Sequence, residues 1–308
     1  MIDDVLKNEF VELLAANFKP EEINEIGRFL LDKKYDHYAI SGTERHITIS
    51  SRKAALILCD TIGSDRNGGL LRLMQFVTGL DGKFFLNRTV ELQRIESFLT
   101  SMTRHGYQYD FKSGKILPAG KDSSRLKNWG ALKNDKIYDC TIMSIDIVKN
   151  SDLVRSHGQK MMEKLYFKFA SFLDHLLEHY DGRIWNWAGD GGVVAMTFKD
   201  HEIRAVLCAL DIQRSLMVFQ LSPDYPIAED FSLRIGLDCG RVKFNLDTGK
   251  IISDVINYAA HLEKQWAKPG CVAISETVFN ALPTKLKTAF PEKDSFEGRT
   301  CYSTSVLA

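Results

Sequence analysis

Two aspartates of the chain stand where a carboxylate could take part in chemistry. Asp190 lies at the tip of the stretch IWNWAGDGGVVAMTF, residues 184–198, which predicts two strands around a glycine-rich turn. A plain hairpin would need only the glycines at that turn. Asp146 lies at the end of the strand-like stretch IYDCTIMSIDIV. Paired aspartates commonly hold one or two Mg²⁺ ions against a triphosphate, so the two residues predict a site for Mg²⁺ or Mn²⁺.

The elements around the two aspartates predict how they meet. From Ile137 onward, strand-like stretches alternate with amphipathic helices. Strands are expected at 137–148, 231–242 and 269–275 and in the hairpin at 184–198, and helices at 157–182, 201–221 and 253–268. This βαββαβ order predicts an α+β fold, a ferredoxin-like sheet with additions and with helices on one face. Because the first strand neighbours the hairpin in such a sheet, Asp146 and Asp190 are expected to meet at one edge.

Residues 1–104 carry no chemical motif and are expected to be mostly helical. Apolar residues recur at helical spacing at Leu6, Phe10, Leu13, Leu14 and Phe18, and Pro20 opens a second helix. The stretch HYAISGTERHITISS interrupts this pattern and predicts a short hairpin or loop. Residues 105–136 are rich in Gly, Ser and Lys and predict a linker. The chain should therefore contain a helical regulatory or interaction domain (1–104), this linker, and the domain that carries the chemistry (137–308).

The composition favours a globular protein of a reducing compartment. Of the 308 residues 44% are hydrophobic, and 40 Lys and Arg balance 40 Asp and Glu, so charge gives no argument for nucleic acid or a membrane surface as partner. No apolar run approaches the ~18 residues of a transmembrane helix, and MIDDVLKNEF lacks a signal-peptide core. The cysteines are Cys59, Cys140, Cys208, Cys239, Cys271 and Cys301. They are scattered and are expected to be buried free thiols, which predicts a cytoplasmic protein.

Four stretches of the second half resemble the successive blocks of class III nucleotide cyclases. They are YDCTIMSIDIVKNSDL, IWNWAGDGGVVAMTF, LRIGLDCGRVKF and VINYAAHLEKQWAKPGCVAISETVF, and they follow the order and separations of that family over residues 137–308. The resemblance implies an enzyme that makes a cyclic mononucleotide and pyrophosphate from a nucleoside triphosphate. It also implies a head-to-tail homodimer with each active site between two subunits.

The resemblance gives roles to residues of the first block and of the hairpin. Asp146 and Asp190 match the metal-binding aspartates of the family, which implies two Mg²⁺ or Mn²⁺ ions per site, with Ile147 as a further ligand. The backbone from Ile147 to Ser151, which includes Asn150, leads into a helix. Because a helix N-terminus binds anions, Ile147, Asn150 and Ser151 are expected to contact the phosphates of the substrate.

Asn257 and His261 are the expected catalytic residues of the last block. Asn257 matches the asparagine that positions the ribose and the phosphate, and it would come from the other chain of the dimer. His261 stands where the family usually has an arginine that stabilises charge on the α-phosphate. Histidine is shorter and only partly charged at neutral pH, so we expect a slow reaction or help from Arg241, Lys243 or Lys264. The alternative is a catalytically degenerate, dimeric nucleotide-binding module.

The base-binding positions depart from the family in a consistent way. Adenylate-forming members have a lysine four residues before the second aspartate, where this chain has Asn186. They have an aspartate or threonine seven residues before the asparagine, where this chain has Lys250. Lysine only donates hydrogen bonds, whereas asparagine donates and accepts, so the pair suits a carbonyl-rich base, uracil better than cytosine. An atypical adenylate cyclase with other adenine contacts is the alternative.

These departures resemble the pyrimidine cyclases of bacterial antiphage Pycsar systems. In those systems, infection triggers the synthesis of cyclic UMP or cyclic CMP, which activates a separate effector that disables the cell. The resemblance implies a cytoplasmic pyrimidine cyclase with such an effector as its partner. It also implies an infection-sensing or effector-associated role for the helical domain.

Three other features have simpler interpretations. His175 and His179 have the i, i+4 spacing of a zinc pair but no third ligand, so a solvated helix face is expected. Trp185 and Trp187 share one parity of the hairpin and are expected to pack on one side, in a core or at a dimer face. The sequence AGDGG resembles the turn of GGDEF-type synthases, which share the βαββαβ core, but VINYAAHLEK argues against that family.

Overall fold

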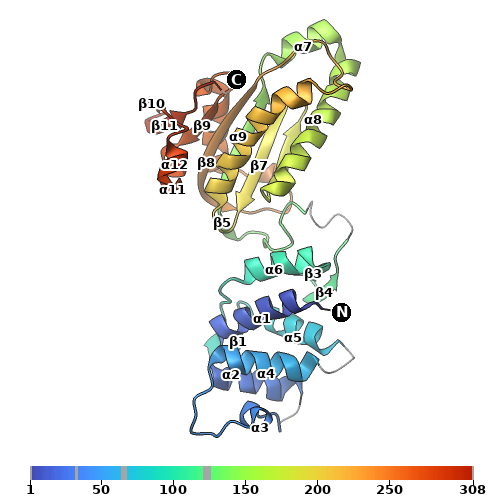
Figure 1. The fold of residues 1–308 in the computed structure, drawn as a ribbon, viewed down its shortest axis with the longest axis vertical. Helices are drawn as coiled ribbons and strands as arrows, with labels where there is room; N and C mark the ends of the chain where they lie inside the picture. The colour runs from blue at the N-terminus through green and yellow to red at the C-terminus, as the bar shows by residue number, and fades with distance from the viewer. Residues whose placement is uncertain (1, 32–33, 64–67, 121–125, 307–308) are drawn as a thin grey trace. The chain divides into compact units, whose positions relative to one another are not determined.

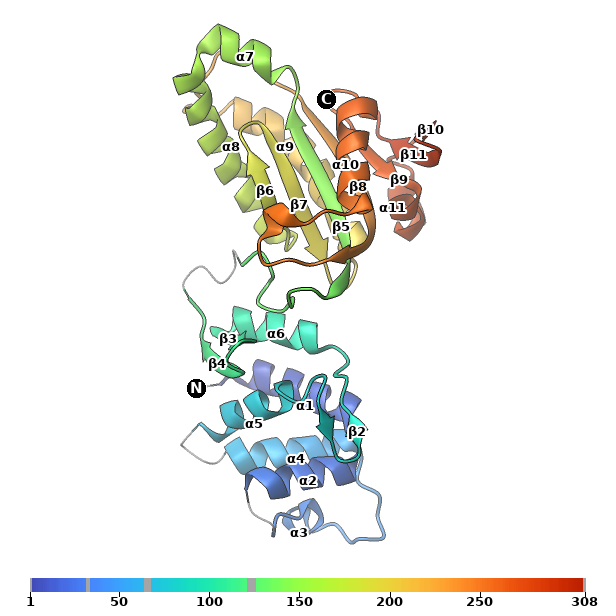
Figure 2. The ribbon, with the colours of Figure 1, turned by 180° about the vertical axis from the view of Figure 1, so that it is seen from behind.

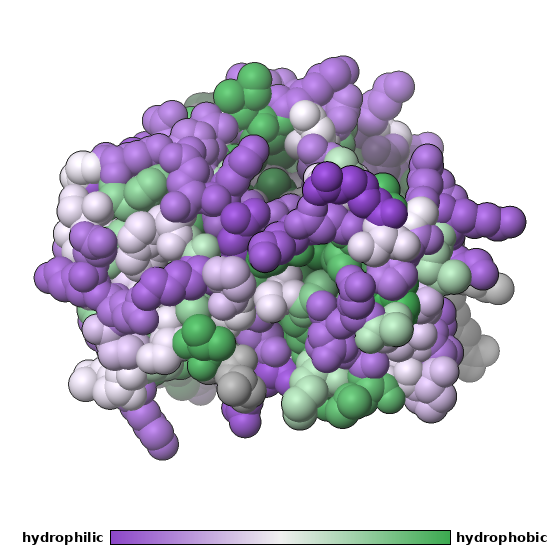
Figure 3. All heavy atoms as spheres, turned by 90° about the horizontal axis from the view of Figure 1, so that it is seen from above, coloured by the Kyte–Doolittle hydropathy of each residue, from purple (hydrophilic) through white to green (hydrophobic). Residues whose placement is uncertain are grey.

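The computed structural model describes residues 2–31, 34–63, 68–120 and 126–306. The chain forms two compact units, residues 1–132 and residues 133–308 (Figure 1, Figure 2). Seen from above, hydrophilic residues cover most of the visible surface, and hydrophobic residues form separate patches among them (Figure 3). Within the described ranges, no helix is both long enough and apolar enough to cross a membrane. The six cysteines are free and buried, as the sequence predicts.

The first unit is mostly helical, as the sequence predicts. It contains α1 (Asp4–Asn17), α2 (Pro20–Leu30), α3 (His37–Ser41), α4 (Ser51–Gly63), α5 (Gly69–Thr78) and α6 (Ile95–Arg104), the strand pair β1 (Phe84–Phe85) and β2 (Arg88–Thr89), and the strand pair β3 (Tyr107–Asp110) and β4 (Lys115–Pro118). Helix α1 buries Leu6, Phe10, Leu13 and Leu14, which form its predicted apolar stripe. Asp3 caps this helix, because its carboxylate accepts a hydrogen bond from the backbone N–H of Leu6 at 2.8 Å.

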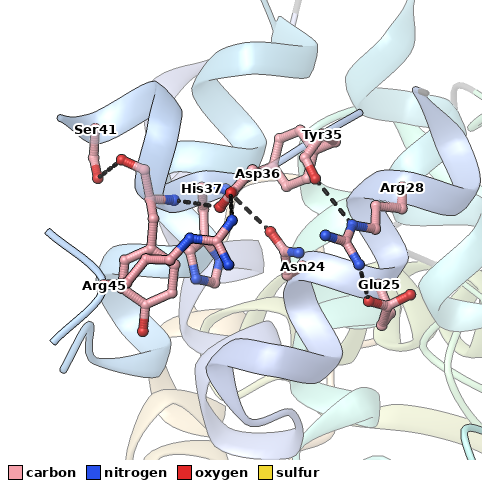
Figure 4. A network of polar contacts seen from close by, with 9 residues as sticks. Asn24, Glu25, Arg28, Tyr35, Asp36, His37, Ser41 and Arg45 are labelled. Carbon is pink, nitrogen blue, oxygen red and sulfur yellow. Dashed lines mark hydrogen bonds and ion pairs between the residues drawn. The ribbon is translucent and has the colours of Figure 1, made fainter. Parts of the chain in front are cut away.

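Residues 37–51, expected as a hairpin or loop, begin with the short helix α3. Asp36 caps this helix by accepting a backbone hydrogen bond in its first turn, and it pairs with Arg45 at 2.7 Å. Asn24 on α2 accepts a hydrogen bond from the backbone N–H of His37 at 3.0 Å (Figure 4). These contacts attach the stretch to α2, and the N-cap aspartate is the local signal for a helix.

The expected linker at 105–136 differs from the structure. Strands β3 and β4 form a hairpin in this segment that packs next to α6 and α5, and the first unit ends at Leu132. Trp129 is 1% exposed and Leu132 is fully buried, so apolar anchors hold the segment although its composition is polar. Residues 121–125 of the expected linker lie outside the described residues. The boundary between the units therefore lies after Leu132 rather than at 104.

The second unit combines a sheet with helices. Its elements are β5 (Ile137–Ile147), α7 (Asn150–His157), α8 (Gln159–His179), β6 (Arg183–Ala188), β7 (Gly191–Thr197), α9 (His201–Gln220), β8 (Leu233–Lys243), the 3-10 turn η2 (Thr248–Lys250), α10 (Asp254–His261), the π-helical turn η3 (Leu262–Trp266), β9 (Val272–Ser275), α11 (Glu276–Ala281), α12 (Thr284–Lys287), β10 (Glu292–Phe296) and β11 (Arg299–Ser303). The sheet has the strand order β10-β11-β9-β8-β5-β7-β6 among the described residues. Neighbouring strands are antiparallel except β8 and β9, which are parallel. The predicted α+β, ferredoxin-like core is confirmed by the central order β8-β5-β7-β6.

Helices cover both faces of this sheet. Helices α8 and α9 cover one face (Figure 1). On this face Met143 and Ile145 of β5 belong to one buried core with Leu165 and Phe169 of α8. Helix α10 covers the opposite face beside β5 and β8 (Figure 2). A Cβ at Gly236 would lie 2.3 Å from a backbone carbonyl oxygen of α10, so glycine permits this close packing. The expectation of helices on one face holds for α8 and α9 but is wrong for α10, which packs on the opposite face.

Candidate active site

The two aspartates expected to bind metal lie next to each other at the end of β5. Strand β5 pairs with β7 so that Asp146 lies opposite Gly191, the residue after Asp190. The backbone N–H of Ile147 donates to the carbonyl of Asp190 at 3.2 Å. A Cβ at Gly191 would lie 2.7 Å from the carbonyl oxygen of Ile145 and 3.1 Å from Oδ1 of Asp146. Glycine at this position therefore allows the turn to hold Asp190 close to Asp146.

Asp146 and Asp190 offer carboxylate oxygens as metal ligands. Across the part of the chain that the structure describes, no group of three or more His, Cys, Asp or Glu side chains could hold a metal ion. Two aspartates on neighbouring backbone segments fit a hard divalent cation that takes its other ligands from backbone carbonyls, water and phosphate oxygens. The residues present therefore fit Mg²⁺ or Mn²⁺ together with a triphosphate.

Arg234 on β8 compensates the charge of Asp146 within one protomer. The two residues are partners in the register of β5 and β8, and Nη2 of Arg234 donates to Oδ2 of Asp146 at 2.6 Å. The Nη1 atom donates to the backbone carbonyl of Lys264 at 3.2 Å, and Nε lies 3.3 Å from Oε1 of Glu263. The sequence motifs do not single out Arg234, although an arginine inside the apolar alternation of FSLRIGLDCGRV indicates a charged partner on that face.

Glu263 is a buried carboxylate in the π-helical turn η3. It is 6% exposed, and burial, with the nearby charge of Asp146 as the second cause, raises its pKa to about 7. The guanidinium of Arg234 and a hydrogen bond with Ser144 oppose this rise. Oε1 has no hydrogen-bond partner within the described structure, so its contact with Arg234 is an ion pair without hydrogen-bond geometry. A π-helical turn has no clear sequence signature, so sequence reasoning misses this residue.

The segment after β5 leads into α7, as the sequence predicts. Lys149 takes a left-handed φ of 55°, and α7 begins at Asn150, with Ser151 exposed in its first turn. The hydroxyl of Tyr166 on α8 donates to Oδ1 of Asn150 at 2.6 Å. Burial raises the pKa of Tyr166, and the nearby charge of Asp190 adds to this rise. The structure therefore brings Asn150 and Tyr166 near Asp190, and no sequence signal indicates Tyr166.

Asn257 and His261 lie one turn apart on α10, and both are exposed. Nδ1 of His261 lies 2.8 Å from Oε1 of Glu297, a residue of the turn between β10 and β11. Within one protomer His261 therefore pairs with Glu297 rather than with the metal-site aspartates. Of the cations expected near His261, Lys243 pairs with Asp135 at 2.8 Å.

The turn between β10 and β11 is anchored on α10 through Tyr258. The hydroxyl of Tyr258 donates to the carbonyl of Phe296 at 3.2 Å, and the guanidinium of Arg299 lies 4.5 Å from the centre of its ring. A cation over an aromatic face is attracted by the ring quadrupole. These contacts hold Glu297 beside His261.

The elements that carry Asn186 and Lys250 lie side by side. The turn η2 contacts β6, and the hydroxyl of Thr248 donates to the backbone carbonyl of Trp185. Asn186 follows this carbonyl and is exposed. Lys250 is 75% exposed and pairs with Asp247 at 3.0 Å. The two expected base-binding positions are therefore on neighbouring elements, with both side chains open to solvent.

The tryptophans of the hairpin lie on different faces. Trp187 packs against the core under α8, with its ring 6.1 Å from that of Phe169. Trp185 is 1% exposed, and its ring lies 5.8 Å from that of Phe244. A bulge in β6 shifts the register against β7 between Ile184 and Asn186, at Trp185. The expectation of a shared face is therefore wrong, because the extra residue of the bulge changes the alternation.

Comparison with known proteins identifies the family of this chain. The family model for the adenylate and guanylate cyclase catalytic domain matches residues 132–304. Comparison with curated proteins finds no match. Among solved structures, the chain is similar to the dimeric guanylyl cyclase domain of the RhoGC fusion protein from the aquatic fungus Blastocladiella emersonii, with 21% identity, 56% of this chain and 97% of that chain covered, and a TM-score of 0.48. It is also similar to the adenylyl cyclase CyaB from P. aeruginosa, with 18% identity, 56% and 96% covered, and a TM-score of 0.47.

The family match spans the whole candidate site. Residues 132–304 are more than half of the 308-residue chain, and they include β5, the aspartate turn, α10 and the β10–β11 hairpin. The structural similarities have low identities and low TM-scores, so membership is based on the family model. The resemblance to class III nucleotide cyclases is thereby confirmed. The chain belongs to the family of adenylate and guanylate cyclase catalytic domains and is a class III nucleotide cyclase.

Proposed function

We propose that this cyclase converts a pyrimidine nucleoside triphosphate, UTP in preference to CTP, to the 3′,5′-cyclic nucleotide and pyrophosphate. The contact between β6 and η2 carries this proposal, because these elements bear Asn186 and Lys250. Lysine would donate to one carbonyl of the base, and the asparagine amide would donate to a second carbonyl and accept from the N–H between them. Uracil has this edge. Cytosine has one ring carbonyl and loses a contact.

The proposed reaction is an attack of the ribose 3′-hydroxyl on the α-phosphorus with departure of pyrophosphate. Asp146, Asp190 and Ile147 would hold Mg²⁺ or Mn²⁺, two ions per site. When bound, such ions neutralise phosphate charge and lower the pKa of the attacking hydroxyl. Asn150 and Ser151, in the first turn of α7, would bind phosphate oxygens. The protein contributes mainly by positioning these groups and by stabilising charge.

A homodimer would complete each site. Asn257 would position the ribose and phosphate, and His261 would stabilise charge, opposite the aspartates of the other protomer. Both residues are exposed on α10, as an interface role requires. Leu246 and Ile252 on either side of η2 are 64% and 87% exposed. Exposed apolar side chains beside functional residues are typical of a surface that pairs with a partner.

The product would serve as a second messenger in bacterial antiphage defence and would activate a separate effector. The resemblance of the base-binding positions to the Pycsar pyrimidine cyclases supports this role. The buried free cysteines fit a reducing compartment such as the cytoplasm. The helical first unit would be the regulatory or interaction module.

The decisive experiment incubates the purified chain with Mn²⁺ and each of ATP, GTP, CTP and UTP, and identifies the products by mass spectrometry. We expect cyclic UMP, with less cyclic CMP, and no product from Asp146→Ala. A matched control is Asp152→Ala, which removes an exposed aspartate of α7 that pairs with Arg155 on the surface.

Each other result would favour one of the alternative functions. Cyclic AMP as the main product would retain the cyclase mechanism and contradict the assignment of Asn186 and Lys250. Absence of any product from a folded dimer would favour a degenerate nucleotide-binding module, with His261 and its Glu297 partner as the sign of lost catalysis.

A further inference from the structure

The turn between β10 and β11 contains a residue type that such a turn does not favour. Phe296 pairs with Arg299, so Glu297 and Gly298 form the two-residue connection of the hairpin. Both have left-handed backbone angles, with φ of 50° and 73°. A hairpin turn of this kind favours asparagine, aspartate or glycine at its first position, because a longer side chain is sterically strained there. The glutamate at position 297 therefore needs an explanation outside the turn.

The contact of Glu297 with α10 offers this explanation. Oε1 of Glu297 lies 2.8 Å from Nδ1 of His261, and the two side chains are 41% and 47% exposed. An exposed ion pair adds little to the stability of a fold, so stability does not account for a strained glutamate. An aspartate would suit the turn better, but its carboxylate would extend one methylene less far towards the imidazole. The length of the side chain therefore indicates that the contact itself matters.

The hairpin is attached to α10 by contacts on both sides of the turn. Before the turn, the carbonyl of Phe296 accepts a hydrogen bond from the hydroxyl of Tyr258 at 3.2 Å. After the turn, the guanidinium of Arg299 lies 4.5 Å from the centre of the Tyr258 ring. The same guanidinium lies 3.8 Å from Oδ2 of Asp238, a carboxylate that is 4% exposed on β8. Because both sides of the turn are held, the backbone that carries Glu297 has a defined position on α10.

The contact with Glu297 leaves one nitrogen of the imidazole for a substrate. An ionised carboxylate only accepts hydrogen bonds, so Nδ1 of His261 is the donor in this pair. A partner on one ring nitrogen fixes the orientation of the ring and the role of the other nitrogen. Nε2 then remains for a phosphate oxygen. In the catalytic triad of serine proteases, a carboxylate orients the histidine in the same way.

We propose that Glu297 is a positioning residue for His261, whose Nδ1 it holds so that Nε2 faces the α-phosphate of the bound nucleotide. The inference rests on the proposed function, in which His261 stabilises charge on that phosphate. Glu297 touches no reacting atom in this arrangement and acts through His261 alone. The hairpin of β10 and β11, at one end of the sheet, thereby gains a part in catalysis.

The test separates turnover from stability with Glu297→Asn. Asparagine suits the turn, so the free energy of unfolding in urea should be unchanged or higher. The shorter, uncharged side chain loses the contact with His261, so kcat should fall about tenfold, the effect of one hydrogen bond to a charged group. KM should change less than about twofold, because charge stabilisation acts mainly in the transition state. A purely structural role of position 297 predicts no loss of kcat.

Two further variants show whether Glu297 acts through His261. Glu297→Gln keeps the length of the side chain and one accepting oxygen, so it should recover part of kcat. In a His261→Ala background, Glu297→Asn should have no further effect, because its partner is already absent. The matched control is Glu292→Ala, which removes a β10 carboxylate that pairs with Lys268 at 2.9 Å. This control should leave kcat unchanged.

The assay uses the full chain, Mn²⁺ and whichever of ATP, GTP, CTP and UTP gives the most cyclic product. Its outcome is therefore independent of the pyrimidine assignment. Wild-type kcat in Glu297→Asn would overturn the inference, and so would a further tenfold loss, roughly, when Glu297→Asn is added to His261→Ala. An equal loss in Glu292→Ala would also overturn it, since any change to the hairpin would then suffice. A folded wild-type chain that makes no cyclic product would overturn the proposed function together with the inference.

Discussion

The two halves of the candidate site are built differently within one protomer. The aspartate half, Asp146 and Asp190, lies on hydrogen-bonded strands and is supported by the half-buried Arg234. The α10 half presents Asn257 and His261 to solvent. The ion pair between His261 and Glu297 in this half is exposed, and such pairs contribute only about 0–1 kcal/mol.

Under the proposed function, this difference separates a half that is preformed within one protomer from a half that a partner would complete. Backbone pairing and buried contacts fix the aspartates before any substrate binds. In the proposed homodimer, the α10 half would gain its final environment from a second protomer and from the nucleotide. Changes to the first half should therefore act on metal binding and on the fold, whereas changes to the second should act on turnover and on base choice.

The largest effect in this comparison is expected from Gly191→Ala. The added Cβ would lie 2.7 Å from the carbonyl oxygen of Ile145, so the turn that carries Asp190 must move. A displacement of about 1 Å can lower a rate about 100-fold, and overpacking typically lowers the free energy of unfolding by about 1–3 kcal/mol. Product formation and urea unfolding measure the two effects.

Gly63→Ala is the control for this substitution. Gly63 is the last residue of α4 in the first unit. No atom lies within 4 Å of the position that a Cβ at Gly63 would take. Its unfolding and its activity should match those of the wild type. A fully active Gly191→Ala variant would show that Asp190 acts without the close approach to Asp146.

A smaller effect is expected from exchanging the base-binding pair. Asn186→Lys combined with Lys250→Asp recreates the donor and acceptor that adenine needs. The ratio of kcat/KM for ATP to that for UTP should rise about tenfold or more, because a site built for hydrogen bonds rejects a base that leaves its groups unpaired. Asn186→Ala alone should lower the activity with UTP without a gain for ATP. An unchanged ratio would show that other residues contact the base.

The sequence predicts the aspartate half well because its signals are local. Strand alternation identifies β5, and the glycine-rich turn identifies the position of Asp190. Their meeting follows from the βαββαβ order, which the sheet confirms. The supporting residues are not predictable in this way. Arg234 meets Asp146 through the register of two strands that are far apart in the sequence, and register depends on the packing of the whole sheet.

Other differences between the sequence predictions and the structure also come from tertiary contacts. The composition of 105–136 is typical of a linker, but Trp129 and Leu132 are buried and attach this segment to the first unit. Trp185 leaves the face of Trp187 because of a bulge, which period-two alternation does not reveal. The partner of His261 comes from a hairpin 36 residues further along the chain. Long-range contacts of this kind leave no local pattern.

The smallest effect is expected from His261→Arg. Arginine keeps its charge across the working pH range and reaches further than histidine, whose charge depends on pH. At neutral pH kcat should rise about threefold, while the new guanidinium can still pair with Glu297. Measurements of kcat for the two enzymes at neutral pH test this expectation.

His175→Arg is the control for this substitution, since it makes the same exchange on α8 outside the proposed site. It should leave kcat unchanged. If His261→Arg also leaves kcat unchanged, the side chain at this position plays no part in turnover, and the α10 half would then act through Asn257 alone. If kcat rises as expected, the exposed half of the proposed site uses a cation on α10 to stabilise charge on the nucleotide, whereas the aspartate half is already formed before the nucleotide binds.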